Sequence, residues 1–147
     1  MSGGQPSGDP LLIVLDENIA SEVLCDALAP VAAKLGARVV MHTEFFPRET
    51  KDPMWMPMAA AQHWAVISCD VSVKRRPAEK DILMSAGVCM YILRGTLGRD
   101  QIREALVKAL PAICRRHAQL APPIICHISR DGEVTVKVGE RRSGIKR

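Results

Sequence analysis

Short apolar runs alternate along this chain with longer segments whose apolar residues recur at helical spacing. Each run is five or six residues long and mostly apolar, which is typical of strands buried on both faces of a sheet. We therefore predict strands at Leu11–Leu15, Ala37–His42, Trp64–Cys69 and Val88–Leu93. The intervening segments predict helices over Ile19–Leu35, Pro53–His63, Pro77–Ala86 and Gly98–Gln119.

The pattern changes after the last of these helices. Ile124–Ile128 and Val134–Val138 flank Arg130-Asp131-Gly132, and an Asp-Gly pair between two apolar runs is a strong signal for a β-hairpin. Strands that alternate with helices favour a mainly parallel sheet with helices on both faces. The predicted fold is therefore an α/β protein, a three-layer α/β/α sandwich that ends in a C-terminal β-hairpin.

Composition and charge set the domain organisation. The chain has 147 residues, 48% hydrophobic and 24% charged, which fits a single globular domain over residues 11–139. We expect residues 1–10, rich in Gly, Pro and Ser, to be disordered, and residues 140–147 to form a basic flexible tail. No apolar run approaches the roughly 20 residues that cross a bilayer, and no secretory signal is present, so we expect a cytoplasmic protein with no membrane association.

The cysteines indicate a reducing compartment and no zinc site. Their number, five, is odd, and no CxxC pair occurs, which favours reduced and mostly buried thiols. Two cysteines and two histidines near the C-terminus could form a ligand set, but two of these four residues are adjacent in a strand and would point to opposite faces. We therefore do not expect zinc at Cys114, His117, Cys126 and His127.

Three acids mark the ends of the predicted elements. Asp16 ends the first strand, Asp70 ends the third, and Asp52 precedes the helix before that third strand. If the first and third strands are neighbours, these carboxylates converge on one crevice at the carboxyl edge of the sheet, where ligands of such sheets bind. Converging carboxylates repel one another, and a hard divalent cation relieves that repulsion, so we expect Mg²⁺ or Mn²⁺. Helix capping is the ordinary structural alternative for each acid.

Basic residues follow directly and suggest a phosphodiester substrate. Lys74, Arg75 and Arg76 come soon after Asp70, and we expect them to contact RNA, with Arg94 and Arg99 extending the same rim. No phosphate-binding GxxxxGK[ST] loop, dinucleotide GxGxxG or hydrolase GxSxG motif occurs. Hydrolysis of a phosphodiester by metal-activated water is the chemistry that these residues would support, with positive side chains neutralising charge.

In these motifs the chain resembles the PIN-like domains of VapC-type toxins. The resemblance spans about residues 11–138 and rests on short motifs in order: Asp16-Glu17-Asn18, Asp52-x-x-Trp55, Ser68-Cys69-Asp70, Arg75-Arg76-Pro77-Ala78-Glu79, Ala109-Leu110-Pro111, Pro122-Pro123-Ile124 and the Arg-Asp-Gly hairpin. It implies a Mg²⁺-dependent endoribonuclease that is silenced by an antitoxin protein. It also implies that Asp16, Asp52 and Asp70 bind the metal, and related toxins often form homodimers.

The chain departs from that family at two positions. Many relatives carry an acid two residues after the third-strand Asp, where Ser72 stands here, and another two residues after Asp52, where Met54 stands. Glu79, in a matching motif, is a candidate fourth carboxylate, and Asp81 is another. The departures leave open an alternative function, a non-catalytic PIN-like module that binds protein or RNA. A DNA nuclease acting through the same acids is a third hypothesis.

Overall fold

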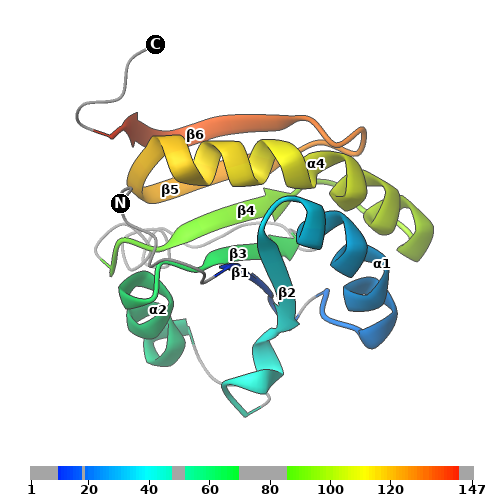
Figure 1. The fold of residues 1–147 in the computed structure, drawn as a ribbon, viewed down its shortest axis with the longest axis horizontal. Coiled ribbons are helices and arrows are strands. Elements are labelled where there is room, and N and C mark those ends of the chain that lie inside the picture. Colours follow the sequence, from blue (N-terminus) through cyan, green and yellow to red (C-terminus); the bar gives the residue numbers. More distant parts are fainter. Residues whose placement is uncertain (1–9, 18, 48–51, 70–85, 143–147) are drawn as a thin grey trace.

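The structure is a computed structural model that describes residues 10–17, 19–47, 52–69 and 86–142. These residues form one six-stranded sheet in the order β2-β1-β3-β4-β5-β6, with helices packed on it (Figure 1). The strands are β1 (Leu11–Leu15), β2 (Ala37–Met41), β3 (Ala65–Cys69), β4 (Cys89–Leu93), β5 (Leu120–Ile128) and β6 (Val134–Arg141). Strands β1 to β5 all run parallel to one another, and β6 runs antiparallel to β5, as predicted.

The central strands are buried on both faces. Every residue of β3 and of β4 is buried, whereas only two of the five residues of the edge strand β2 are buried. Because a central parallel strand has helices above and below it, both of its faces must be apolar. The continuous apolar runs therefore predicted the positions of these strands correctly. Strands β1 and β3 are neighbours, as the predicted crevice between Asp16 and Asp70 requires.

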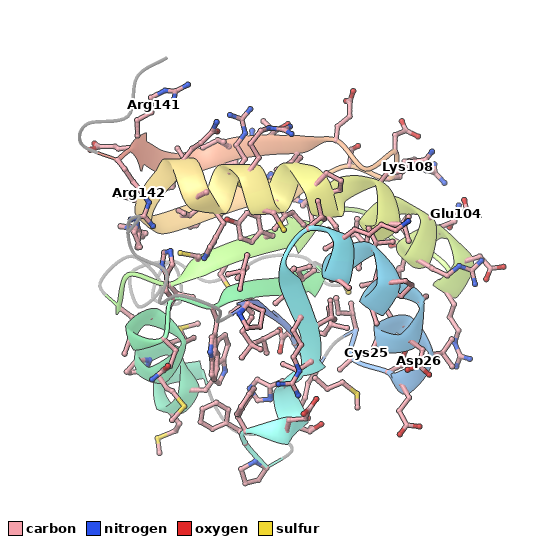
Figure 2. The ribbon with its side chains drawn as sticks, viewed as in Figure 1. Cys25, Asp26, Glu104, Lys108, Arg141 and Arg142 are labelled. Atoms are coloured by element: carbon pink, nitrogen blue, oxygen red, sulfur yellow. The ribbon has the colours of Figure 1, made fainter. Side chains whose placement is uncertain are left out.

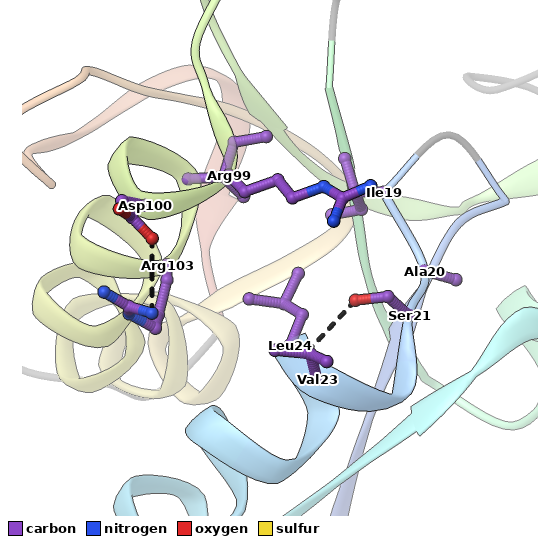
Figure 3. Close-up of a pocket in the computed structure, with 9 residues that line it drawn as sticks. Ile19, Ala20, Ser21, Val23, Leu24, Arg99, Asp100 and Arg103 are labelled. Carbon is purple, nitrogen blue, oxygen red and sulfur yellow. Dashed lines mark hydrogen bonds and ion pairs between the residues drawn. The ribbon is translucent and has the colours of Figure 1, made fainter.

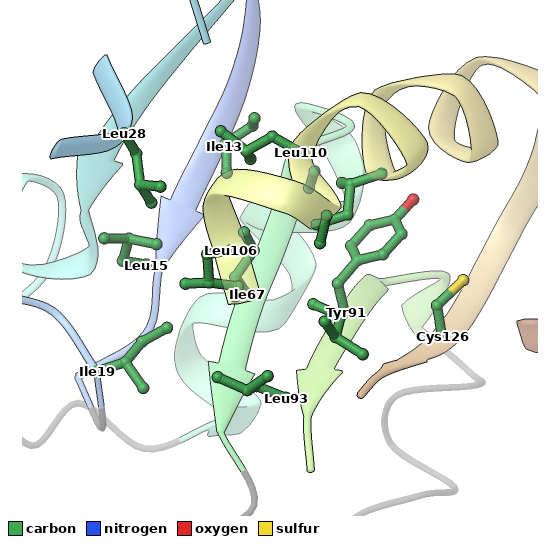
Figure 4. Packing of buried hydrophobic residues seen from close by; sticks show 14 of the residues in the cluster. Ile13, Leu15, Ile19, Leu28, Ile67, Tyr91, Leu93, Leu106, Leu110 and Cys126 are labelled. Carbon is green, nitrogen blue, oxygen red and sulfur yellow. The ribbon is translucent and has the colours of Figure 1, made fainter. Parts of the chain in front are cut away.

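Two cores form the layers on either side of the sheet. One face packs against α1 (Glu22–Lys34) and α4 (Arg99–Gln119), where Leu28, Leu106 and Leu110 cover side chains of β1, β3 and β4 (Figure 4). The other face packs against α2 (Asp52–Ala61) through Trp55, Met56 and Ala59. Successive strand residues alternate between the two cores, as the period of a strand dictates. The described residues confirm the three-layer sandwich.

Helix α1 begins later than the sequence pattern predicted. Ser21 is its N-cap, and the Ser21 hydroxyl oxygen accepts a 3.0 Å hydrogen bond from the Leu24 amide. Asp16 is therefore not the cap of this helix. The helix starts at Glu22 rather than at Ile19, because Asp16 and Ser21 are both favourable N-cap residues and only one of them occupies that position.

Three prolines lie inside helices without ending them. They are Pro30 in α1, Pro57 in α2 and Pro111 in α4, and all three are exposed. A proline removes one helical hydrogen bond, and on a solvent-facing side water can bond to the freed carbonyl. Helix α2 runs through Pro57 because Trp55, Met56 and Ala59 anchor the opposite side of the helix in the core.

The C-terminal hairpin is longer than predicted. Strand β5 begins at Leu120 and β6 continues to Arg141, so the first two residues of the segment 140–147 lie in the sheet. Gly132 in the connecting turn has φ +85°, and a Cβ there would lie 2.5 Å from Lys108 Cβ and 2.9 Å from the Ala105 carbonyl oxygen. The hairpin turn therefore packs closely on α4.

Among the described residues, no helix is long and apolar enough to cross a membrane.

Candidate functional site

Asp16 lies at the carboxyl edge of the sheet, between β1 and β3. Its backbone amide donates a 2.9 Å hydrogen bond to the Ile67 carbonyl and so extends the pairing of the two strands by one residue. Its backbone carbonyl accepts hydrogen bonds from the amides of Ile19 (3.0 Å) and Ala20 (2.9 Å), which close a turn before α1. The half-buried carboxylate is thus mounted on a backbone that is fixed on both sides.

Both oxygens of the Asp16 carboxylate accept hydrogen bonds. The Ser68 hydroxyl donates to Oδ2 at 2.9 Å, and the Glu17 amide donates to Oδ1 at 2.7 Å. A carboxylate has about four lone-pair directions, so each oxygen retains acceptor capacity beyond the bond it makes. The two donors fix the rotation of the group and leave it able to bind a cation through oxygen.

Sequence reasoning missed the part that Ser68 plays. Ser68 is completely buried in a strand that is otherwise apolar, and it lies on the same face as Val66, toward the α2 core. A polar side chain in such a strand needs a hydrogen-bond partner, and Asp16 at the end of the neighbouring strand is that partner. The lone serine in an apolar run was the available signal.

The described structure contains one of the three predicted metal ligands in full. Asp52 is the first residue of α2, one position earlier than the predicted start of this helix, and its side chain lies outside the described residues. One turn later, Trp55 makes an edge contact with His42, the residue after β2, with ring centroids 5.4 Å apart. This contact brings the start of α2 to the carboxyl end of β2, which is paired with β1.

Most of the remaining predicted site residues lie outside the described part of the chain. Strand β3 ends at Cys69, so Asp70 is the next residue along the chain, but its position lies outside the described residues. The same holds for the candidate carboxylate Glu79 and for the predicted RNA contacts Lys74, Arg75 and Arg76. Of the additional basic residues, Arg94 follows β4 with its guanidinium 3.3 Å from His127 Nε2, and Arg99 begins α4.

A cavity of about 450 Å³ opens beside the Asp16 turn (Figure 3). It lies between the starts of α1 and α4, and its walls are mostly aliphatic. Arg99 extends into it from the start of α4, toward the side where Ile19 and Ser21 lie. The lining residues are Ile19, Ala20, Ser21, Val23, Leu24, Arg99, Asp100, Ile102 and Arg103.

Comparison with known families agrees with this arrangement. The model of a family described as a PIN like domain matches residues 12–95, more than half of the chain. The chain belongs to the PIN-like domain family. The matched segment runs from β1 through β4 and contains Asp16, Asp52, Asp70 and Glu79. No curated protein and no solved structure matches the chain. PIN-like domains are often nucleases and typically bind divalent metals.

The PIN-like domain also holds a second polar cluster, at the opposite edge of the sheet. His63 precedes β3, Cys89 begins β4, and His117 lies near the end of α4. One ligand atom from each lies within 4.8 Å of the others, so the three residues could together hold a metal ion. This group was not predicted from the sequence, because its members are 26 to 54 residues apart in the chain.

Hydrogen bonds engage the imidazoles of this cluster. His117 Nε2–H donates to the His63 carbonyl oxygen at 2.9 Å, so the neutral ring accepts at Nδ1 from the Tyr91 hydroxyl, also at 2.9 Å. His63 Nε2 accepts from the Arg142 guanidinium at 2.8 Å, where β6 ends beside α4 (Figure 2). A metal bound here would displace these donors and lie beside a guanidinium.

The electrostatics of the cluster favour neutral side chains. Burial lowers the pKa of His117 to about 4 and raises the pKa of Cys89 to about 12. Burial, and then the charge of Arg142, lower the pKa of His63. Because hydrogen bonds from Tyr91 and Arg142 already engage the two imidazoles, we assign this cluster a structural role: it joins Arg142, which follows β6, to the core. The predicted oxygen-rich site remains at Asp16.

Proposed function

We propose that this PIN-like domain is a metal-dependent endoribonuclease and the toxin of a toxin–antitoxin pair. In this proposal Asp16, Asp52 and Asp70 bind Mg²⁺ or Mn²⁺, and Glu79 adds a fourth carboxylate. The observation that supports it is the Asp16 carboxylate, held by Ser68 across the carboxyl ends of two neighbouring parallel strands. That is the edge at which sheets of this kind bind their ligands.

The chemistry of the Asp16 side chain fits the expected cation. Its donors are carboxylate oxygens, which Mg²⁺ and Mn²⁺ prefer to nitrogen or sulfur. Each oxygen accepts one hydrogen bond and keeps a lone pair, and the group is half-buried rather than enclosed. When bound, a divalent cation lowers the pKa of a coordinated water and neutralises charge on a phosphodiester.

The chain's own residues would bind and orient the substrate. Ser68 and the Glu17 amide hold the Asp16 carboxylate in one orientation, so that little reorganisation accompanies ligand binding. Lys74, Arg75 and Arg76 are proposed to hold the RNA backbone, since phosphate contacts position a nucleic acid without reading its sequence. Arg94 and Arg99, both exposed beyond the end of β4, would extend this positive rim.

A metal titration tests the site. We expect Mn²⁺ binding to the wild type, measured by calorimetry, to be lost in Asp16→Asn. Asp26→Asn is the matched control, because Asp26 is exposed on α1 and the change removes the same charge (Figure 2). Equal Mn²⁺ binding by the wild type and Asp16→Asn would contradict the assignment of Asp16.

The toxin assignment needs a separate test. Induced expression of the wild-type chain in a bacterium is expected to arrest growth, and Asp70→Asn is expected to relieve the arrest at equal protein levels. Co-expression of the protein encoded beside it is expected to restore growth and to form a complex. Growth unaffected by the folded wild-type protein would contradict the toxin proposal without affecting the metal site.

A non-catalytic binding module remains the second candidate. The exposed Met54, which stands where relatives carry an acid, favours it: 71% of this side chain is accessible on α2. Met58, 46% exposed one turn later, extends the same apolar surface, and flexible methionines suit a protein contact. Failure of the wild type to bind Mn²⁺ in the titration above would favour this candidate.

A further inference from the structure

We propose that the cavity between the starts of α1 and α4 binds one unpaired nucleotide of the RNA, with the Arg99 guanidinium contacting its phosphate and stacking on its base. This proposal rests on the ribonuclease function and adds a subsite to it.

The cavity adjoins the turn that follows Asp16. Two of its lining residues, Ile19 and Ala20, donate their amide hydrogens to the Asp16 carbonyl oxygen. The turn that carries the Asp16 carboxylate on one side therefore forms a wall of the cavity on the other. An RNA strand whose scissile phosphate lies at Asp16 would pass its neighbouring nucleotide along this wall.

The size and the walls suit a nucleobase. A volume of about 450 Å³ falls within the range of small-molecule pockets. Of its aliphatic lining residues, Ile19 and Leu24 are buried, whereas Val23 is 74% exposed. Covering this exposed aliphatic surface with the flat apolar face of a base would lower the free energy, because apolar area would be removed from water. The lining contains no aromatic ring, so stacking would fall to the planar Arg99 guanidinium, as Arg commonly does with unstacked bases.

The charge of the cavity favours an anion. Arg103 forms an ion pair with Asp100 at 3.4 Å within α4, so the charges of these two lining residues cancel. Arg99 makes no ion pair with any other described residue and supplies the remaining positive charge. The N-terminal ends of α1 and α4 meet here, and their dipoles add to the positive potential. The phosphate beside the base would neutralise this positive charge.

These features distinguish a nucleotide from an inserted peptide side chain. An apolar peptide residue would fill the aliphatic walls but leave Arg99 without an anionic partner. A nucleotide satisfies both, because its base is flat and its phosphate is charged. A base held in a duplex cannot leave its stack without an added cost, so the subsite predicts a preference for single-stranded RNA.

Binding in the absence of cleavage tests the subsite. Fluorescence anisotropy with a pool of labelled ten-nucleotide single-stranded RNAs, in chelator, separates binding from metal-dependent hydrolysis. We expect Arg99→Gln to weaken binding about 10-fold and to lower the salt slope by about 0.7. Arg115→Gln is the matched control, since Arg115 is exposed on α4 roughly 24 Å further along the helix. It should change binding less than 2-fold.

A second variant tests the aliphatic wall. Val23→Asp places a negative charge in the cavity, and an acid in the first turn of α1 favours the helix, so the variant should fold. We expect it to weaken RNA binding at least 10-fold, whereas Ala29→Asp, an exposed change later in α1, should have little effect. A duplex of the same length should bind more weakly than the single strand.

Several results would overturn the subsite. They are no RNA binding by the folded wild type, equal effects of Arg99→Gln and Arg115→Gln, or equal binding of duplex and single strand. Unchanged RNA binding in Val23→Asp would instead point to a protein partner at this cavity. RNA binding that depends on Arg99 without any cleavage in Mg²⁺ or Mn²⁺ would support the subsite while contradicting the nuclease.

Discussion

The Ser68 hydroxyl and the Asp16 carboxylate are joined by a 2.9 Å hydrogen bond that links the ends of β1 and β3, 52 residues apart in sequence. Ser68 is fully buried, whereas Asp16 is only partly so. The bond therefore runs from the interior of the sheet to its edge and orients a carboxylate that faces the outside. Ser68 is a positioning residue in this arrangement, because it acts through Asp16.

Removal of the Ser68 hydroxyl is expected to weaken metal binding. Ser68→Ala frees the rotation of the Asp16 carboxylate, and loss of such a supporting contact typically lowers metal affinity about 10-fold. Mn²⁺ titration of Ser68→Ala and of the control Ser129→Ala, which alters a hairpin hydroxyl, would measure this. Equal affinity in the two variants would show that Ser68 does not position the ligand.

The protein is expected to lose stability as the pH falls from about 6.5 to 4. The pKa of buried His117 in the folded state is about 4, below its ordinary value of 6.5, so the unfolded chain binds this proton first. At about 1.4 kcal/mol per unit, the loss is roughly 3 kcal/mol. Urea unfolding at pH 7 and pH 4.5 should show a smaller pH effect in His117→Gln than in the wild type. Identical pH effects would contradict it.

Arg142 is expected to depress the pKa of His63. Its guanidinium lies 2.8 Å from His63 Nε2 and adds a positive charge to a half-buried ring, which opposes protonation. In Arg142→Gln the pKa of His63 should therefore rise, as followed by the imidazole proton shifts in an NMR titration. Arg141→Gln, which changes the neighbouring strand residue, provides the control. A pKa of His63 that does not rise would exclude this electrostatic contact.

Gly132→Ala is expected to destabilise the fold by about 2–4 kcal/mol, because the residue combines a left-handed φ with close packing on α4. Gly36→Ala is a useful comparison, since Gly36 has φ +74° but no atom within 4 Å of the added Cβ. Its cost in unfolding free energy should be only that of the backbone, about 1–2 kcal/mol. Equal losses in denaturant unfolding would indicate that the α4 contact is unimportant.

The fold was largely predictable from sequence, for local reasons. The continuous and almost entirely apolar runs of β3 and β4 indicated central strands, and Asp131-Gly132 marked the hairpin that joins β5 to β6. The start of α1 was placed wrongly because two favourable cap residues, Asp16 and Ser21, compete within six positions. The interior prolines were tolerated because tertiary contacts on the buried faces outweigh a local preference.

The candidate site was predictable only in part, because its contacts connect distant segments. Asp16 at a strand end could be identified from its neighbours in sequence, but its bond to Ser68 depends on the pairing of β1 with β3. The group of His63, Cys89 and His117 likewise assembles three elements. The position of Arg99 in a cavity beside the Asp16 turn required the packing of α4 against α1.

RNA cleavage tests the central claim most directly. The purified chain is incubated with a mixed pool of structured RNAs in Mg²⁺, in Mn²⁺ and in chelator, beside Asp16→Asn, Asp70→Asn and the control Asp26→Asn. We predict metal-dependent cuts by the wild type and by Asp26→Asn, and none by the other two variants. Cleavage that persists in chelator or in Asp16→Asn, or no cleavage and no metal binding by the folded wild type, would contradict the ribonuclease proposal.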